Sequence, residues 1–291
     1  MPISPAELIL NEHGHIYHLD LHPEQIAPLI FTVGDPQRVP RVSKYFDRID
    51  HRVQKREFIT HTGQLGQHRV SVISTGIGTD NIDIALNEID ALFNIDLQKR
   101  EPKEELTSVS FIRIGTSGSL QGDLPLGSFL ASSFGIGMDN LLRYYPFAED
   151  ETEREIHGAF TRHSDPLPVD PYVVRGSQVL LELFRDWNRG LTLTCPGFYA
   201  PQGRQLRLKS SIDPDTLRKF SEFSFGEHRI TNFEMETSAL YGMAKLLGHH
   251  ALSCSVLIAN RMDQTFSADP HADEERLIRE VLEKIEGRVR G

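Results

Sequence analysis

Three arginines stand at or near the ends of apolar segments, close to glycine-rich or polar stretches: Arg38, Arg56 and Arg113. A guanidinium can bind two oxygens of a phosphate group at once, and glycine lets backbone N–H groups approach an anion closely. This pattern predicts an oxyanion site. For any single arginine, a surface ion pair is the simpler interpretation, because most arginines that flank strands form one.

Arg113 differs from the other two arginines, because it lies inside the otherwise apolar run Phe111–Ile114. A charge that is buried without a partner costs free energy. Arg113 therefore needs a partner, and the sequence leaves two choices open. One is an internal carboxylate, and the other is a bound ligand.

Two carboxylates, Glu234 and Glu236, precede the small-residue segment Thr237–Leu240. Side chains two residues apart do not share a helix face. If one of them points inward, its carboxylate can accept hydrogen bonds from sugar hydroxyls. From composition alone, the better interpretation is a helix N-terminus whose dipole favours acidic side chains.

An aromatic ring, an amide and a guanidinium follow a predicted strand within seven residues: Phe198, Gln202 and Arg204. Glutamine offers both a donor and an acceptor, whereas arginine only donates. The ring can stack on a planar heterocycle, and the two polar groups suit an edge that carries two carbonyls. An ordinary surface loop is the competing interpretation.

Several common motifs are absent: the Walker A loop, the serine-hydrolase elbow and the HExxH zinc motif. The segment Gly76–Asn81 begins like a dinucleotide-binding loop but lacks its third glycine. Four histidines near the N-terminus could indicate a metal site, but no cysteine or carboxylate set completes it, so we predict no metal. They are His13, His15, His18 and His22.

Strands that alternate with helices would position these groups. The runs that predict strands are 29–33, 57–62, 68–74, 108–114, 128–134, 191–195 and 251–258. The segments with helical spacing are 82–92, 180–187, 234–247 and 277–285. We also expect a hairpin turn at 63–66, a helix cap at Asp80 or Asn81, a strand end at 115–118, a solvated excursion at 97–107, and loops with short helices over 140–175. The alternation predicts an α/β fold with a mixed sheet and a ligand site where strands end.

The composition bounds the class of partner. The chain has 291 residues and a formal net charge of −10. This acidic balance, without a long basic run, disfavours nucleic acids and anionic membranes. No signal peptide or membrane span is recognisable. Cys195 and Cys254 are interpreted as reduced thiols, which predicts a cytoplasmic protein.

Taken together, the motifs resemble the nucleoside phosphorylase-I family, and within it most closely the uridine phosphorylases. The resemblance extends from about His18 to the last helix, and the order and spacing of the motifs carry it. They are Gly34–Arg38, Arg56–Phe58, Ser74–Gly78, Arg113–Gly118, Phe198–Arg204 and Glu234–Glu236. The resemblance implies one α/β domain over residues 1–291, with a mixed, partly barrel-like sheet flanked by helices. It places the segment 1–25 at a subunit interface.

The resemblance also implies roles for individual residues. Those that would bind phosphate are Gly34, Arg38, Arg56, Arg113 and Thr116. Those that would contact ribose are His18, Thr116, Met235 and Glu236. Those that would bind the base are Phe198, Gln202, Arg204, Ile258 and Arg261. The implied catalytic residues are Arg113, Arg204 and Glu236. His18 and Arg56 would reach the site from a neighbouring subunit.

The implied reaction is an attack of inorganic phosphate, as co-substrate and without a cofactor, on C1′ of uridine. Uracil would leave as an anion that donors of Gln202 and Arg204 stabilise, and ribose 1-phosphate would remain. The excursion at 95–107 is similar to that of dimeric members, which implies a homodimer with shared sites. Asn81 stands where many hexameric members have a serine at an interfacial cation site, so the resemblance does not extend to that site.

Three alternatives remain beside a uridine-specific enzyme. The first is a phosphorylase of broader or purine specificity, although Asn260–Arg261 stands where purine-specific relatives generally carry an aspartate. The second is a hydrolytic nucleosidase, which should lack a complete phosphate site. The third is a non-catalytic nucleoside-binding protein, which should have lost the arginines or Glu236. Fold alone does not decide among them.

Overall fold

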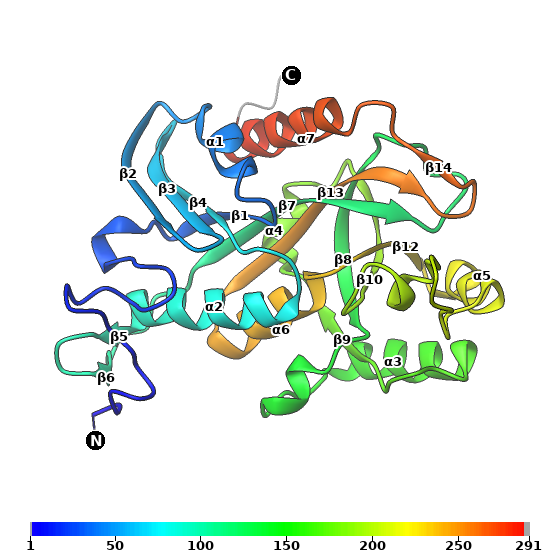
Figure 1. Ribbon diagram of the computed structural model, residues 1–291, viewed down its shortest axis with the longest axis horizontal. Coiled ribbons are helices and arrows are strands. Elements are labelled where there is room, and N and C mark those ends of the chain that lie inside the picture. The colour runs from blue at the N-terminus through cyan, green and yellow to red at the C-terminus, as the bar shows by residue number, and fades with distance from the viewer. Residues whose placement is uncertain (1, 288–291) are drawn as a thin grey trace.

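The computed structural model describes residues 2–287, which form a large mixed β-sheet flanked by helices (Figure 1). Five strands of this sheet close into a barrel in the order β7, β13, β8, β10 and β12, and β12 pairs again with β7. Their bounds are β7 (Ser110–Ser119), β13 (His250–Asn260), β8 (Phe129–Gly137), β10 (Asn188–Thr194) and β12 (His228–Glu234). The prediction of an α/β fold with a mixed, partly barrel-like sheet is confirmed.

The remaining strands extend this barrel. On the β7 side they are β1 (Leu29–Val33), β4 (His68–Ser74), β3 (Phe58–Leu65) and β2 (Arg48–Lys55). Elsewhere on the sheet are β9 (Tyr172–Arg175), β11 (Ser224–Phe225) and β14 (Thr265–Phe266). The excursion predicted at 97–107 carries a separate two-stranded sheet, β5 (Ile95–Asp96) with β6 (Glu101–Pro102).

Helices flank the sheet on several sides (Figure 1). They are α1 (Arg38–Ser43), α2 (Thr79–Asn94), α3 (Glu151–Ser164), α4 (Gln178–Glu182), α5 (Pro214–Glu222), α6 (Thr237–Leu247) and α7 (Pro270–Ile285). Short 3-10 turns occur at Pro23–Gln25, Leu141–Tyr144 and Ala200–Gln202. Helices α2 and α6 pack side by side on one face, and α1 and α7 lie on the other.

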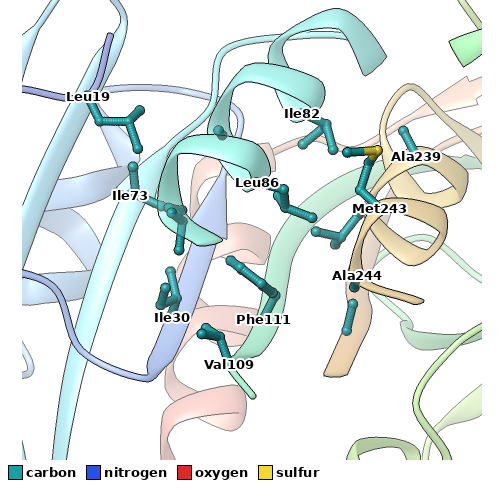
Figure 2. Packing of buried hydrophobic residues seen from close by; sticks show 14 of the residues in the cluster. Leu19, Ile30, Ile73, Ile82, Leu86, Val109, Phe111, Ala239, Met243 and Ala244 are labelled. Atoms are coloured by element: carbon teal, nitrogen blue, oxygen red, sulfur yellow. The ribbon is translucent and has the colours of Figure 1, made fainter. Parts of the chain in front are cut away.

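Alternation along β7 divides its side chains between these two layers, because successive residues of a strand face opposite ways. Phe111 packs with Leu86 of α2 and Met243 of α6 in one hydrophobic cluster (Figure 2). Ile112 packs with α1 and α7 in the other cluster. Arg113 follows Phe111 by two residues and therefore faces the α2–α6 layer. The N-termini of these two helices lie nearby.

The structure corrects several expected boundaries. The hairpin turn lies at 66–67 rather than 63–66, and Gly63 is inside β3. A Cβ atom on Gly63 would lie 2.0 Å from the carbonyl oxygen of Arg48 on the unpredicted strand β2, so glycine permits this pairing. Helix α2 has Gly78 as its N-cap residue, not Asp80 or Asn81. Its first turn is held by a carboxylate from elsewhere in the chain.

Other corrections concern lengths. The strand expected to stop at 115–118 continues through these residues to Ser119, where it pairs with β12 and closes the barrel. The segment 140–175 contains a 14-residue helix, α3, whose start is fixed by reciprocal hydrogen bonds between Asp150 and Glu153. The helix expected over 180–187 covers only Gln178–Glu182. The segment 234–247 is helical only from Thr237, because β12 occupies its first residue.

Candidate active site

A cavity of about 700 Å³ lies where β1, β7, β12 and β13 meet their loops. It brings together most of the residues predicted from the sequence. These are Gly34, Arg38, Arg113, Thr116, Phe198, Gln202, Arg204, Met235, Glu236 and Ile258. The parallel pairing of β1 with β4 and β7 explains the meeting of Gly34 and Arg113, because parallel strands end at the same edge of a sheet.

Arg113 lies at the centre of this cavity wall and is 7% exposed. Its Nη2 donates to the Glu236 carboxylate and lies 3.4 Å from Oε2 of Glu234. Burial alone would lower the pKa of Arg113, but these two carboxylates raise it above its ordinary value. The second terminal nitrogen, Nη1, is buried without a hydrogen-bond partner. Arg113 therefore has an internal carboxylate as its partner, the first of the two choices. Its Nη1 finds no partner in the described chain and is the donor that a ligand would use.

Gly115 makes room for this guanidinium. A Cβ atom at position 115 would lie 1.8 Å from Nη1 of Arg113, so any larger residue would displace the charged group. Gly115 is on the same face of β7 as Arg113, two residues further along the strand. The glycines of this segment lie inside strand β7, where Gly115 leaves space for the Arg113 guanidinium. The sequence pattern instead predicted that the strand ends at them.

Glu236 links the N-termini of α2 and α6. It is the N-cap residue of α6, yet its Oε1 accepts a hydrogen bond of 2.7 Å from the backbone N–H of Gly78, the N-cap residue of α2. Its other oxygen pairs with Arg113. Burial raises the pKa of Glu236 above its ordinary value, although Arg113 opposes the shift. The inward-pointing alternative for this carboxylate is the one that the structure shows.

Glu234 caps the N-terminus of α6, a role that the sequence predicted for both carboxylates. Its carboxylate accepts hydrogen bonds from the backbone N–H groups of Glu236, at 2.8 Å, and of Thr237, at 3.0 Å. Thr194 Oγ1 on β10 also donates to it, at 2.7 Å. Glu234 therefore fixes the backbone turn from which Glu236 projects.

Arg38 approaches the cavity from the start of α1 and is 8% exposed. Its Nη1 donates to the carbonyl oxygen of Ile114, at 3.2 Å, and its Nη2 donates to Oε1 of Glu274 on α7, at 2.7 Å. Its Nε is buried without a partner. Arg38 and Arg113 line the same cavity, and each has one N–H donor without a partner in the described chain.

Phe198, Gln202 and Arg204 form another part of the cavity lining. The Arg204 guanidinium lies 3.8 Å from the centre of the Phe198 ring, and it donates to the side-chain oxygen of the buried Gln202. Burial lowers the pKa of Arg204 to about 10, and the nearby charge of Arg261 adds to this effect. This part of the lining presents an amide and a guanidinium without a carboxylate partner in the described chain, which suits carbonyl oxygens or a developing negative charge.

Comparison with known proteins agrees with this geometry. Residues 28–289 match the sequence profile of the family described as the Phosphorylase superfamily. The chain belongs to this superfamily. Its enzyme class is therefore that of a pentosyltransferase, and the resemblance inferred from the motifs is confirmed.

Relatives in the superfamily include several uridine phosphorylases. That of Thermococcus kodakarensis is 27% identical over 263 residues, which cover 90% of this chain and 83% of the relative. That of Haemophilus influenzae is 25% identical over 257 residues, covering 86% and 88%. A crystal structure described as Trypanosoma brucei nucleoside phosphorylase with uridine phosphorylase activity superposes with a TM-score of 0.86 at 27% identity, covering 96% of this chain and 99% of that one.

Three of the predicted site residues do not line this cavity: Arg261, which lines the adjoining one, and His18 and Arg56. His18 and Arg56 flank one aromatic ring: the His18 ring centre is 4.8 Å from that of Tyr17, and the Arg56 guanidinium is 6.0 Å from it. His18 is held by a 2.6 Å contact between its Nδ1 and Glu88. That His18 and Arg56 reach the site from a neighbouring subunit stays a prediction.

Sequence analysis missed other residues of the cavity. They include Glu57, Ile77, Asn81, Ser117 and Phe266. Asn81 donates to Glu57 Oε1 at 3.4 Å, and the Ser117 hydroxyl is buried without a partner. A signal for Glu57 is its place beside Arg56, and one for Ser117 is its place in the segment after Arg113. Arg261 was predicted for the base but lines an adjoining cavity.

Three other features bear on earlier expectations. Over residues 2–287, no group of three or more histidine, cysteine, aspartate or glutamate side chains is arranged to hold a metal ion. None of the helices in that range is long and apolar enough to cross a membrane. Cys195 and Cys254 are both buried, free thiols.

Proposed function

We propose that this pentosyltransferase is a uridine phosphorylase, which cleaves uridine with inorganic phosphate to uracil and ribose 1-phosphate. The observation that carries the proposal is the position of Arg113, which pairs with Glu236 and keeps Nη1 free in the same cavity as Gln202 and Arg204. The uridine phosphorylases among its relatives support the choice of substrate.

At the phosphate end, Arg38 and Arg113 would bind the anion through their free donors, with Gly34 and Thr116 beside them. A phosphate held by one donor from each of two guanidiniums is oriented as well as bound, because each donor fixes the direction of the oxygen that it contacts. Arg56 of a neighbouring subunit would complete this set. The catalytic effect of this end is the alignment of a phosphate oxygen with C1′.

At the ribose, Glu236 would accept hydrogen bonds from the sugar hydroxyls, and Met235 would pack on the ring. Glu236 also contacts Arg113, so a single carboxylate connects the sugar with the phosphate site. Thr116 lies between these groups on the cavity wall, and His18 of a neighbouring subunit would close the ribose end. This arrangement would hold the nucleoside so that C1′ faces the phosphate.

At the base, Gln202 and Arg204 would donate to the uracil carbonyls while Phe198 and Ile258 contact the ring, with Arg261 supporting the polar groups. In the reaction, a bond forms from a phosphate oxygen to C1′, and the C1′–N1 bond breaks through a transition state of oxocarbenium character. The bonding pair leaves with the base, and the resulting anion takes a proton from solvent. The donors of Arg204 and Gln202 stabilise that charge as it develops.

We also propose that the protein works in the cytoplasm as a homodimer whose subunits exchange His18 and Arg56. The two free thiols support a reducing compartment. The position of Tyr17, His18 and Arg56 together outside their own cavity supports the exchange. Segment 1–25, which contains two of these residues, would then form part of the interface.

Substrate choice is tested by incubating the protein with phosphate and either uridine or inosine and separating the products by chromatography. We expect uracil from uridine and little hypoxanthine from inosine. Hypoxanthine alone would contradict the proposal and favour a purine enzyme, a class also present among the relatives as a 24% identical purine nucleoside phosphorylase of Bacillus thuringiensis. No release from either nucleoside would favour a binding protein.

A further inference from the structure

A second cavity, of about 560 Å³, adjoins the base end of the first. The two cavities share a wall, whose residues are Phe198, Arg204, Ala259 and Phe266. The second cavity continues between the start of α5 and the turn that joins β13 to β14. The second cavity therefore lies directly beside the part of the first cavity that Arg204 lines.

The charge in this second cavity is entirely positive. Its lining includes Arg204, Arg218 and Arg261 but no aspartate or glutamate, in a chain whose net charge is −10. Arg218 is neutralised on α5, where it lies 3.0 Å from Glu222 and 3.3 Å from Asp215. Two guanidiniums therefore remain without a carboxylate partner.

These two guanidiniums, Arg204 and Arg261, are both about half removed from solvent and make no ion pair within the described chain. Nη1 of Arg261 is buried and has no hydrogen-bond partner. Burial lowers the pKa of both, and the charge of Arg261 lowers that of Arg204 further. Two like charges that line one cavity and influence each other favour the binding of an anion there.

We propose that the second cavity binds an acidic group carried on the pyrimidine base, so that the enzyme accepts nucleosides with a carboxylate beside the carbonyl that Arg204 recognises. This inference rests on the proposed function and deepens it. The bonds formed and broken at C1′ are those of uridine cleavage. The carboxylate takes no part in them, and the leaving base carries it away unchanged.

The test compares 5-carboxymethyluridine with 5-carbamoylmethyluridine. The two have nearly the same shape, and in both a methylene group insulates the ring from the substituent. We expect kcat/KM for the acid to exceed that for the amide by about tenfold or more, as a charge-assisted hydrogen bond provides. Equal values, or a preference for the amide, would overturn the proposal. Uridine is assayed in parallel, because failure to cleave uridine would instead contradict the proposed function.

Gln264→Glu provides a matched variant, because Gln264 lines the second cavity only and the change adds a carboxylate at nearly constant shape. We expect the preference for the acid to fall about tenfold, with kcat/KM for uridine unchanged. Gln67→Glu, in the exposed turn between β3 and β4, adds the same charge elsewhere and should leave the preference intact. An unchanged preference for the acid in Gln264→Glu would contradict the proposal that the second cavity binds the carboxylate.

An acidic group could also come from a free anion rather than from the base. Addition of millimolar acetate to the uridine assay distinguishes these sources. We expect no increase in kcat/KM for uridine. An increase to the value of the acidic nucleoside would show that the cavity is a site for free anions, and the proposal would be wrong.

Discussion

At the scale of single residues, the chemistry of the site depends on charges that are buried and only partly satisfied. Arg113 and Glu236 neutralise each other, yet each faces the cavity. Residue types and spacing were enough to predict that Arg113 needs a partner. They could not show that the partner is the carboxylate of Glu236, because Glu236 is 123 residues away in the chain.

Arg113→Ala should reduce phosphate-dependent turnover by about 10²–10³-fold, because it removes a donor for phosphate and leaves Glu236 without its counter-ion. Arg113→Lys keeps the charge but loses the fork, so it should fold like the wild type and remain strongly impaired. Steady-state kinetics and thermal unfolding check both variants. Near wild-type activity in either would contradict the phosphate assignment.

Gln202→Ala combined with Arg204→Ala should weaken selection of the base rather than binding of phosphate. The two side chains form another part of the cavity lining than Arg38 and Arg113. We expect kcat/KM for uridine to fall by about 10²-fold, with KM for phosphate changed by less than about threefold. Kinetics with uridine and inosine measure this. An unaltered preference between the two nucleosides would rule out a base-reading role.

Glu236 should give uridine binding an unusual acid dependence. Its pKa is raised above the ordinary value of 4.5 by burial, so the carboxylate that would accept hydrogen bonds from the sugar hydroxyls is lost as pH falls through this raised pKa. Calorimetric titration of uridine without phosphate should show affinity falling at a higher pH than for an ordinary glutamate. The matched variant Glu236→Gln should bind weakly and without this dependence. The same pH dependence of uridine affinity in the wild type and in Glu236→Gln would contradict the assignment of Glu236 to the ribose hydroxyls.

At the scale of elements, α7 does not line the first cavity, but its Glu274 holds the cavity residue Arg38 in place. Glu274 on this helix holds Arg38 through one carboxylate oxygen and Arg41, at 2.6 Å, through the other. The C-terminal helix was predicted from its apolar stripe, and this contact could not be, since it joins residues 236 positions apart. Glu274 is a positioning residue for the phosphate end.

Glu274→Gln should raise KM for phosphate by about tenfold, because Arg38 loses a charge-assisted anchor, while KM for uridine changes by less than about twofold. Glu275→Gln is the matched control: it makes the same change on the next residue, which pairs with Lys44 at 2.6 Å and is not in contact with Arg38. A fall in KM for phosphate would mean that Glu274 competes with the ligand and does not position Arg38.

The boundaries that were predicted correctly and incorrectly have different physical origins. Strand β1 and helix α7 have local apolar patterns, so their existence was evident from the sequence. The course of β7 through Gly115 and Gly118 depends on closure against β12, which is a tertiary contact. The same holds for the start of α2, where the backbone N–H of the N-cap residue Gly78 donates to the distant Glu236.

At the scale of the whole molecule, the fold of this acidic protein brings arginines that are far apart in the sequence to two adjoining cavities. The net charge is −10, yet the two adjoining cavities contain Arg38, Arg113, Arg204 and Arg261. Composition correctly indicated that the chain is acidic overall, and motifs indicated where arginines gather. The parallel strands β1, β4 and β7 and the closed barrel bring these separate motifs to one cavity, and only the three-dimensional structure shows their distances.

The most direct test of the account is to follow uracil and ribose 1-phosphate together, from uridine, with and without inorganic phosphate. The account predicts no release without phosphate, and equal amounts of the two products when phosphate is present. Uracil released at the same rate without phosphate, with free ribose as the other product, would make the protein a hydrolase. That result would contradict the assignment of Arg38 and Arg113 to phosphate.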